Sequence, residues 1–158
     1  MEKDKNRRDV LVSIQPRYAS KIIEGTKSVE LRRRFPETIE TDSRILIYST
    51  SPIQAIVGYA VVNAVQRMSV RKLWQNYQHA ACIERGSFDL YFDGLKGGYA
   101  ILLGEVKRFK RTISVEYLRE RFGFVPPQSF RYITPEYHLF FRDDRVQVTH
   151  RHKHLYRA

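Results

Sequence analysis

The sequence predicts a small, mostly antiparallel β barrel with short flanking helices, an α+β fold in which strands predominate. Apolar residues recur at every second position over several long stretches, which is typical of strands with one buried face. The stretches with helical spacing are short, whereas a doubly wound parallel sheet needs regular crossover helices. The 158 residues, of which 42% are hydrophobic and 13% aromatic, suffice for one packed core.

The first predicted elements are a strand, a helix and a second strand. Residues 9–14 alternate apolar side chains and predict a strand that is buried on at least one face. Proline at the first helical position and glycine after the last predict a short helix over 16–24. After Gly25, Val29 and Leu31 point to one side of a strand, so they supply core.

The middle of the chain predicts two long strands. A loop over 36–43 leads into a compact apolar strand at 44–48, which Pro52 stops. Residues 53–65 then alternate with period two. Gly58 lies within that alternation and marks a bulge or a close approach of two backbones.

Short helices and further extended segments follow. Ser69 is expected to cap one helix, a second helix lies near 88–92, and 99–109 returns to strand. A helix from Ser114 to Gly123 comes next, and the prolines of residues 124–133 favour an extended chain.

The ends of the chain are expected to lie outside the folded unit. We expect a last helical turn between Thr134 and Phe141, and a loosely ordered, basic tail beyond Arg142. The predicted organisation is a basic arm at 1–8, one domain at 9–142 and a basic tail at 143–158.

The charge balance favours a polyanionic partner. The chain has 28 Lys and Arg against 17 Asp and Glu, a formal charge of +11 and a pI near 9.9. A polyanion such as a nucleic acid is the natural partner of this excess, although a basic pI can also serve solubility alone.

Several classes of protein are not favoured. Cys82 has no second cysteine to pair with, and no apolar run approaches the roughly 20 residues that span a bilayer. In residues 150–154, histidine alternates with arginine and lysine. A metal site would need a fixed strand and supporting residues around the ligands, so a basic tail is the favoured interpretation. We therefore expect a cytoplasmic protein with no membrane segment, no metal and no cofactor.

The charged strand after Gly25 allows three interpretations. Glu30 could pair with Arg32 on a solvated face, contributing about 0 to 1 kcal/mol. The guanidinium groups of Arg32, Arg33 and Arg34 could bind phosphates in bidentate geometry while Glu30 positions one of them. Lys27 and Glu30 could instead form a coupled acid and base at the mouth of a cleft.

Two further segments offer contacts to a nucleic acid. The hydroxyls before Pro52 could bind a phosphate or merely end a strand, and PPQSFRY combines polar side chains with aromatic rings that could stack on bases or fill the core. The candidates from these segments are Ser49, Ser51, Gln128, Arg131 and Tyr132.

The segment GTKSVELR at residues 25–32 resembles the Gly-x-Lys-x-x-Glu-x-Arg signature of the ASCH domain family, relatives of the PUA barrels. Gly25, Lys27, Glu30 and Arg32 match all four signature positions. YSTSP, GYAI and PPQSFRYI are similar to longer ASCH members described as predicted transcriptional regulators, so the likeness runs from about residue 9 to residue 133.

The resemblance implies a compact PUA-like barrel with a cleft beside the first helix, lined by Lys27, Glu30 and Arg32. It also implies RNA or a modified nucleotide as the ligand. Some small members are amidohydrolases of acetylated cytidine that carry a threonine where this chain has Glu30, and the chain departs from that pattern. RNA cleavage is another activity proposed in the family.

From these observations we predict a nucleic-acid-binding module for RNA or a modified nucleotide. Its binding residues would be the signature side chains with Arg33, Arg34 and the five candidates given above. One alternative is a metal-independent hydrolase, a ribonuclease or an amidohydrolase, with Lys27 and Glu30 as catalytic residues. Another alternative is a regulator that contacts DNA or a protein.

Overall fold

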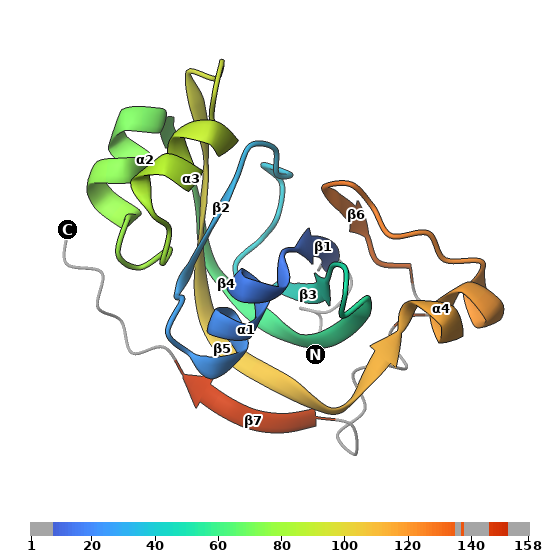
Figure 1. The fold of residues 1–158 in the computed structure, drawn as a ribbon. Coiled ribbons are helices and arrows are strands. Elements are labelled where there is room, and N and C mark those ends of the chain that lie inside the picture. The colour runs from blue at the N-terminus through green and yellow to red at the C-terminus, as the bar shows by residue number, and fades with distance from the viewer. Residues whose placement is uncertain (1–7, 135–136, 138–145, 152–158) are drawn as a thin grey trace.

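The computed structural model of the chain describes residues 8–134, 137 and 146–151, which form a mixed α+β fold built around one curled sheet (Figure 1). Its elements are, in order, β1 (Val10–Ile14), α1 (Pro16–Glu24), β2 (Val29–Arg32), β3 (Arg44–Ser49), β4 (Ala55–Ser69), α2 (Val70–Tyr77), α3 (Arg85–Tyr91), β5 (Gly97–Ser114), α4 (Val115–Phe122), β6 (Phe130–Tyr132) and β7 (Val146–Arg151).

The sheet confirms the predicted barrel-like, mostly antiparallel fold. Its strands follow the order β2-β5-β4-β3-β1-β6, and β7 pairs with β5 beside this path. Neighbouring strands are antiparallel except β1 and β3, which are parallel. The long strands β4 and β5 bend at register shifts, one of them at the predicted bulge between Ile56 and Gly58.

The barrel is open between β2 and β6, the two strands at the ends of the path. β2 and β6 end the path of paired strands, yet the Arg32 side chain of β2 donates hydrogen bonds to Ser129, one residue before β6, and to Ser13 of β1. We call the gap between β2 and the chain entering β6 the seam. A side chain therefore closes the seam where a backbone ladder would close a complete barrel.

Helix α1 has the boundaries that its sequence predicts. Pro16 starts it, and Gly25 ends it in the left-handed conformation with φ of 88°, which a glycine adopts at little steric cost. Ala19, Ile22 and Ile23 are buried and pack with β1, β3 and β5 in the largest core cluster.

Residues 70–92 form a helical insert between β4 and β5. The Ser69 hydroxyl accepts from the Lys72 amide at its start, as predicted. Leu73, Phe88 and Phe92 anchor the insert against β2 and β5 in a separate apolar cluster. Figure 1 shows the insert and α4 at opposite ends of the curled sheet.

The structure differs from the sequence predictions near the C-terminus. Residues 146–151, expected to be loosely ordered, form β7 and pair with β5. Val146 and Val148 alternate with polar residues there, a strand pattern that the surrounding charges obscured. Most of the helical turn expected over 134–141 falls outside the described residues, as do most of the basic arm and tail, so these remain predictions.

The second helix of the insert begins at Arg85, earlier than expected. None of the helices within the described ranges is both long enough and apolar enough to cross a membrane.

Candidate functional site

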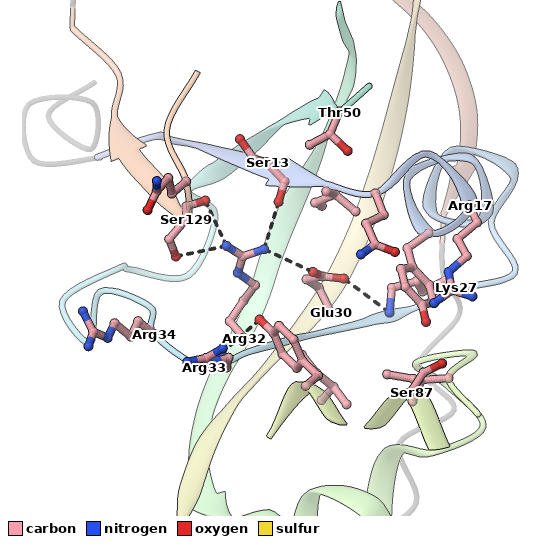
Figure 2. Close-up of a pocket in the computed structure, with 17 residues that line it drawn as sticks. Ser13, Arg17, Lys27, Glu30, Arg32, Arg33, Arg34, Thr50, Ser87 and Ser129 are labelled. Atoms are coloured by element: carbon pink, nitrogen blue, oxygen red, sulfur yellow. Dashed lines mark hydrogen bonds and ion pairs between the residues drawn. The ribbon is translucent and has the colours of Figure 1, made fainter. Parts of the chain in front are cut away.

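A pocket of about 620 Å³ lies at the seam (Figure 2). Its floor is β2, and its walls come from the end of β1 with the start of α1, from the insert, and from residues 128–129. These segments are far apart in the sequence, so the pocket exists only because the sheet curls. Pockets of this size accommodate a ligand of a few hundred daltons.

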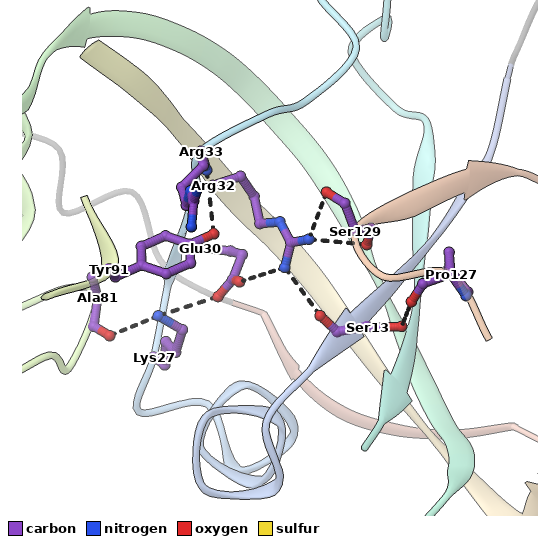
Figure 3. Close-up of polar contacts among 9 residues, drawn as sticks. All are labelled: Ser13, Lys27, Glu30, Arg32, Arg33, Ala81, Tyr91, Pro127 and Ser129. Carbon is purple, nitrogen blue, oxygen red and sulfur yellow. Dashed lines mark hydrogen bonds and ion pairs between the residues drawn. The ribbon is translucent and has the colours of Figure 1, made fainter. Parts of the chain in front are cut away.

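A buried charge network forms the floor of the pocket (Figure 3). The Lys27 Nζ atom lies 3.3 Å from Glu30 Oε2, and Arg32 Nη1 lies 3.7 Å from Glu30 Oε1. Glu30 therefore sits between two cations, and the trio keeps one net positive charge.

Both cations also bind backbone carbonyls. Lys27 Nζ donates to the Ala81 carbonyl of the insert at 2.7 Å. Arg32 donates through Nη1 to the Ser13 carbonyl at 3.0 Å, and through Nη2 to the carbonyl and hydroxyl of Ser129 at 2.9 and 3.0 Å. The floor thus holds two walls in place, the insert through Lys27 and the chain entering β6 through Arg32.

Glu30 pairs with Arg32, as the first interpretation expected, but the network is buried, so the solvated face of that interpretation is wrong. Lys27 is 3% exposed and Glu30 and Arg32 are each 7% exposed. Alternation correctly separated Glu30 and Arg32 from Val29 and Leu31, but it gave no sign that other segments of the chain cover the polar side of the strand. Charges held in this way are stable only when each is paired and hydrogen-bonded.

The rim of the pocket adds more positive charge. Arg17, Arg33 and Arg34 line it and are exposed, in contrast to the buried floor (Figure 2). Among the described residues, the lining contains five cationic side chains and one carboxylate, that of Glu30. Such an excess favours an anionic ligand.

Tyr91 of α3 lies beside this network. Its hydroxyl accepts a hydrogen bond from the Arg33 amide at 3.2 Å, and the Arg33 guanidinium lies 5.9 Å from the ring centroid. Burial raises the pKa of the Tyr91 phenol, and the positive charge of Arg32 partly opposes that rise. The phenol is therefore neutral at physiological pH and retains a proton that it can donate.

The structure brings six of the ten predicted binding residues to the pocket. Gln128 lines it together with the five charged residues of 27–34 that were predicted. Of the hydroxyls before Pro52, Ser49 is buried at the end of β3 and Ser51 is exposed in the following turn, while Thr50 between them lines the pocket.

Arg131 and Tyr132 lie outside the pocket, on β6. The Arg131 guanidinium lies 5.4 Å from the Phe124 ring centroid, over the cluster beneath α4. Tyr132 is 38% exposed, with the Arg8 guanidinium 5.3 Å from its ring centroid.

Sequence reasoning missed several lining residues, among them Ser13, Arg17, Tyr91 and Ser129. Ser129 lies within PPQSFRYI, and Ser13 and Arg17 lie within the wider stretch of family likeness, which is the signal that could have identified them. None of the missed residues carries a local pattern of its own, because their role depends on distant segments meeting at the seam.

No group of three or more potential metal ligands occurs within residues 8–134, 137 and 146–151. Cys82, which we expected to serve packing, is half-buried with its Sγ atom 3.4 Å from the Thr26 carbonyl oxygen.

Comparisons with known proteins point to one family. A model described as the ASCH domain matches residues 12–126. An ASCH domain-containing ribonuclease from Zymomonas mobilis is 33% identical over 132 residues, which cover 83% of this chain and 88% of that protein. The crystal structure of ASCH from Zymomonas mobilis matches with a TM-score of 0.79 and 32% identity, over 85% of this chain and 93% of that one.

Proposed function

This chain belongs to the ASCH domain family, and from that premise we propose that it binds single-stranded RNA in the seam pocket and cleaves it there. The observation that carries the proposal is the lining of the pocket, which sets five cations around one carboxylate. The ribonuclease named among its relatives supports RNA as the substrate.

A single strand of RNA suits a pocket of about 620 Å³ better than a duplex does. Proteins that read RNA inside a pocket take unpaired nucleotides, because the bases of a helix are stacked and paired. The exposed guanidinium groups of Arg33 and Arg34 would bind phosphates at the rim, and the polar side chain of Gln128 could contact a base edge.

The pair formed by Lys27 and Glu30 could carry out the cleavage. Glu30 would accept the proton of a ribose 2′-hydroxyl as that oxygen bonds to the neighbouring phosphorus. Lys27 would give a proton to the 5′-oxygen as the phosphorus–oxygen bond breaks, leaving a 2′,3′-cyclic phosphate and a 5′-hydroxyl. Because the two groups are 3.3 Å apart, the proton on Glu30 can then return to Lys27.

Arg32 would stabilise the negative charge that develops on the phosphoryl oxygens. Its hydrogen bonds to Ser13 and Ser129 fix the guanidinium before substrate arrives. A group that is already in position does not have to reorganise in the transition state.

Incubation of the pure protein with labelled single-stranded RNA, in the presence of a chelator, tests this function. We expect products that end in a cyclic phosphate, and none from DNA of the same sequence, which lacks the attacking hydroxyl. Glu30→Gln should lower the rate by about 100-fold or more, whereas Glu116→Gln, at an exposed carboxylate of α4, should leave it unchanged.

Cleavage of DNA at the same rate, or full activity of Glu30→Gln, would contradict the mechanism. Binding of RNA without cleavage would reduce the function to a binding module. Binding that does not weaken with salt would contradict phosphate recognition as well, because contacts to phosphates release counterions.

A further inference from the structure

We propose that the surface around Tyr132 is a second RNA subsite, which stacks the base of a nucleotide next to the one held in the seam pocket. The inference rests on the proposed RNA binding and extends it beyond the pocket. It assigns a chemical role to an aromatic side chain that lies outside the pocket lining.

Strand β6 leads directly away from the pocket. Gln128 and Ser129 line the pocket, and β6 begins at the next residue, Phe130. Tyr132 is three residues beyond Ser129, a separation of about 10 Å in an extended strand. A chain of RNA that leaves the pocket on this side would pass over β6 within one or two nucleotides.

A row of rings follows the same direction. Phe35, one residue after the rim residue Arg34, lies 6.0 Å from Phe130 between ring centroids, and Phe130 lies 6.3 Å from Tyr132. Phe130 and Tyr132 are two residues apart on a strand and therefore share a face. The row thus connects the rim of the pocket to Tyr132.

Exposure increases along the row. Phe35 is 5% exposed and belongs to the core, Phe130 is half-buried against that core, and Tyr132 is 38% exposed. The first two rings serve packing, while the last presents aromatic surface to solvent. The Phe130 ring packs edge-on beside the Tyr132 ring and restricts its orientation, so a base could stack on Tyr132 at little cost in side-chain entropy.

The surroundings of Tyr132 suit a nucleotide. The Arg8 guanidinium lies 5.3 Å from the ring centroid and is available for a phosphate. Asp9, which follows Arg8 in the sequence, is 2% exposed and is bound by Arg44 at 2.8 Å, so it does not repel a phosphate strongly. A stacking ring beside a cation is the arrangement that single-stranded nucleic acids favour.

The test compares ligands of different length. Affinity is measured for 2′-fluoro-uridine monophosphate and for 2′-fluoro oligouridines of two, four and eight nucleotides, which lack the hydroxyl needed for cleavage. Tyr132→Ala should leave the affinity for the monophosphate unchanged and weaken binding of the four-nucleotide ligand about tenfold. Tyr132→Phe should retain the affinity, because it keeps the ring.

Tyr117→Ala is the matched control, since Tyr117 is 43% exposed on α4, away from β6, and should change neither affinity.

Equal affinity of Tyr132→Ala and the unchanged protein at every length would overturn the subsite. Equal weakening for the monophosphate and the longer ligands would also overturn it, because the effect would then act through the pocket. If the unchanged protein binds the monophosphate but gains nothing with length, the subsite fails while the proposed function stands. If it binds no RNA at all, the proposed function itself fails.

Discussion

Arg32 and Arg33 are adjacent in the sequence and differ completely in their surroundings. Arg32 is 7% exposed and donates to two backbone carbonyls and a hydroxyl across the seam, whereas the Arg33 side chain is exposed at the pocket rim. Arg32 is the last residue of β2, and Arg33 lies in the bend that follows it. Two identical side chains are therefore used for different purposes.

The same division separates the floor of the pocket from its rim. Lys27 and Arg32 form the floor and hold the walls together, and Arg17, Arg33 and Arg34 remain accessible to a ligand. A cluster of basic residues in a sequence thus combines a structural and a binding role. Substitutions can separate the two, because floor residues should affect stability as well as cleavage, whereas rim residues should affect binding and leave stability unchanged.

The largest expected effect is on stability, from Arg32→Ala. This change removes the side chain that closes the seam and leaves Glu30 with Lys27 as its remaining partner in the network, so we expect a loss of about 3 kcal/mol in the free energy of unfolding. Chemical denaturation measures it. Arg33→Ala should change stability by no more than about 0.5 kcal/mol, and equal losses for the two variants would remove the distinction.

Lys27→Met should have the next largest effect on stability, a loss of about 2 kcal/mol in the free energy of unfolding. The substitution removes the hydrogen bond to the Ala81 carbonyl and one charged partner of Glu30. Hydrogen exchange can locate the change. We expect faster exchange in the helical insert for Lys27→Met, and faster exchange in residues 128–132 for Arg32→Ala. Identical exchange patterns would show that the two cations do not hold separate walls.

The double substitution of Arg33→Ala with Arg34→Ala should act on binding and not on stability. Loss of two phosphate contacts should reduce the slope of log affinity against log salt concentration by about 1.4 for a single strand. Titration of RNA at several salt concentrations gives that slope. Lys72→Ala with Arg71→Ala, at two exposed cations of α2, is the control and should leave it unchanged.

The smallest expected effect concerns Tyr91 at alkaline pH. Burial raises the pKa of its phenol, so its contribution to stability is complete below the unfolded pKa of about 10 and is lost as the pH rises through the higher folded pKa. Tyr91→Phe should therefore lose less stability above about pH 10 than the unchanged protein. Denaturation at pH 9 and 11 checks this, with Tyr117→Phe as a control that should show the full loss.

Most elements of the fold could be predicted because their signals are local. Pro16 and Gly25 delimit α1, and Ser114 and Gly123 delimit α4, as residues at helix ends do in general. The parallel pairing of β1 with β3 and the pairing of β7 with β5 could not be predicted, since a strand pattern does not name its partner.

The site was predictable only in part, for a related reason. Family likeness and alternation identified Lys27, Glu30 and Arg32, but their partners are remote. Arg32 bonds to residues 19 and 97 positions away, and Lys27 to one 54 positions away. The spacing of residues along the chain does not predict contacts between such remote segments, which explains why Ser13, Tyr91 and Ser129 were missed.

The helical insert leaves the sheet at Ser69 and returns at Gly97, and these two residues are paired with each other across β4 and β5. The segment between them can therefore vary in length without shifting the pairing of β4 with β5, provided that its apolar side chains still cover β2 and β5. The insert forms one wall of the pocket and joins two paired ends of the sheet. A different insert, arising among relatives or introduced by engineering, could therefore change ligand preference while the pairing of β4 with β5 stays the same.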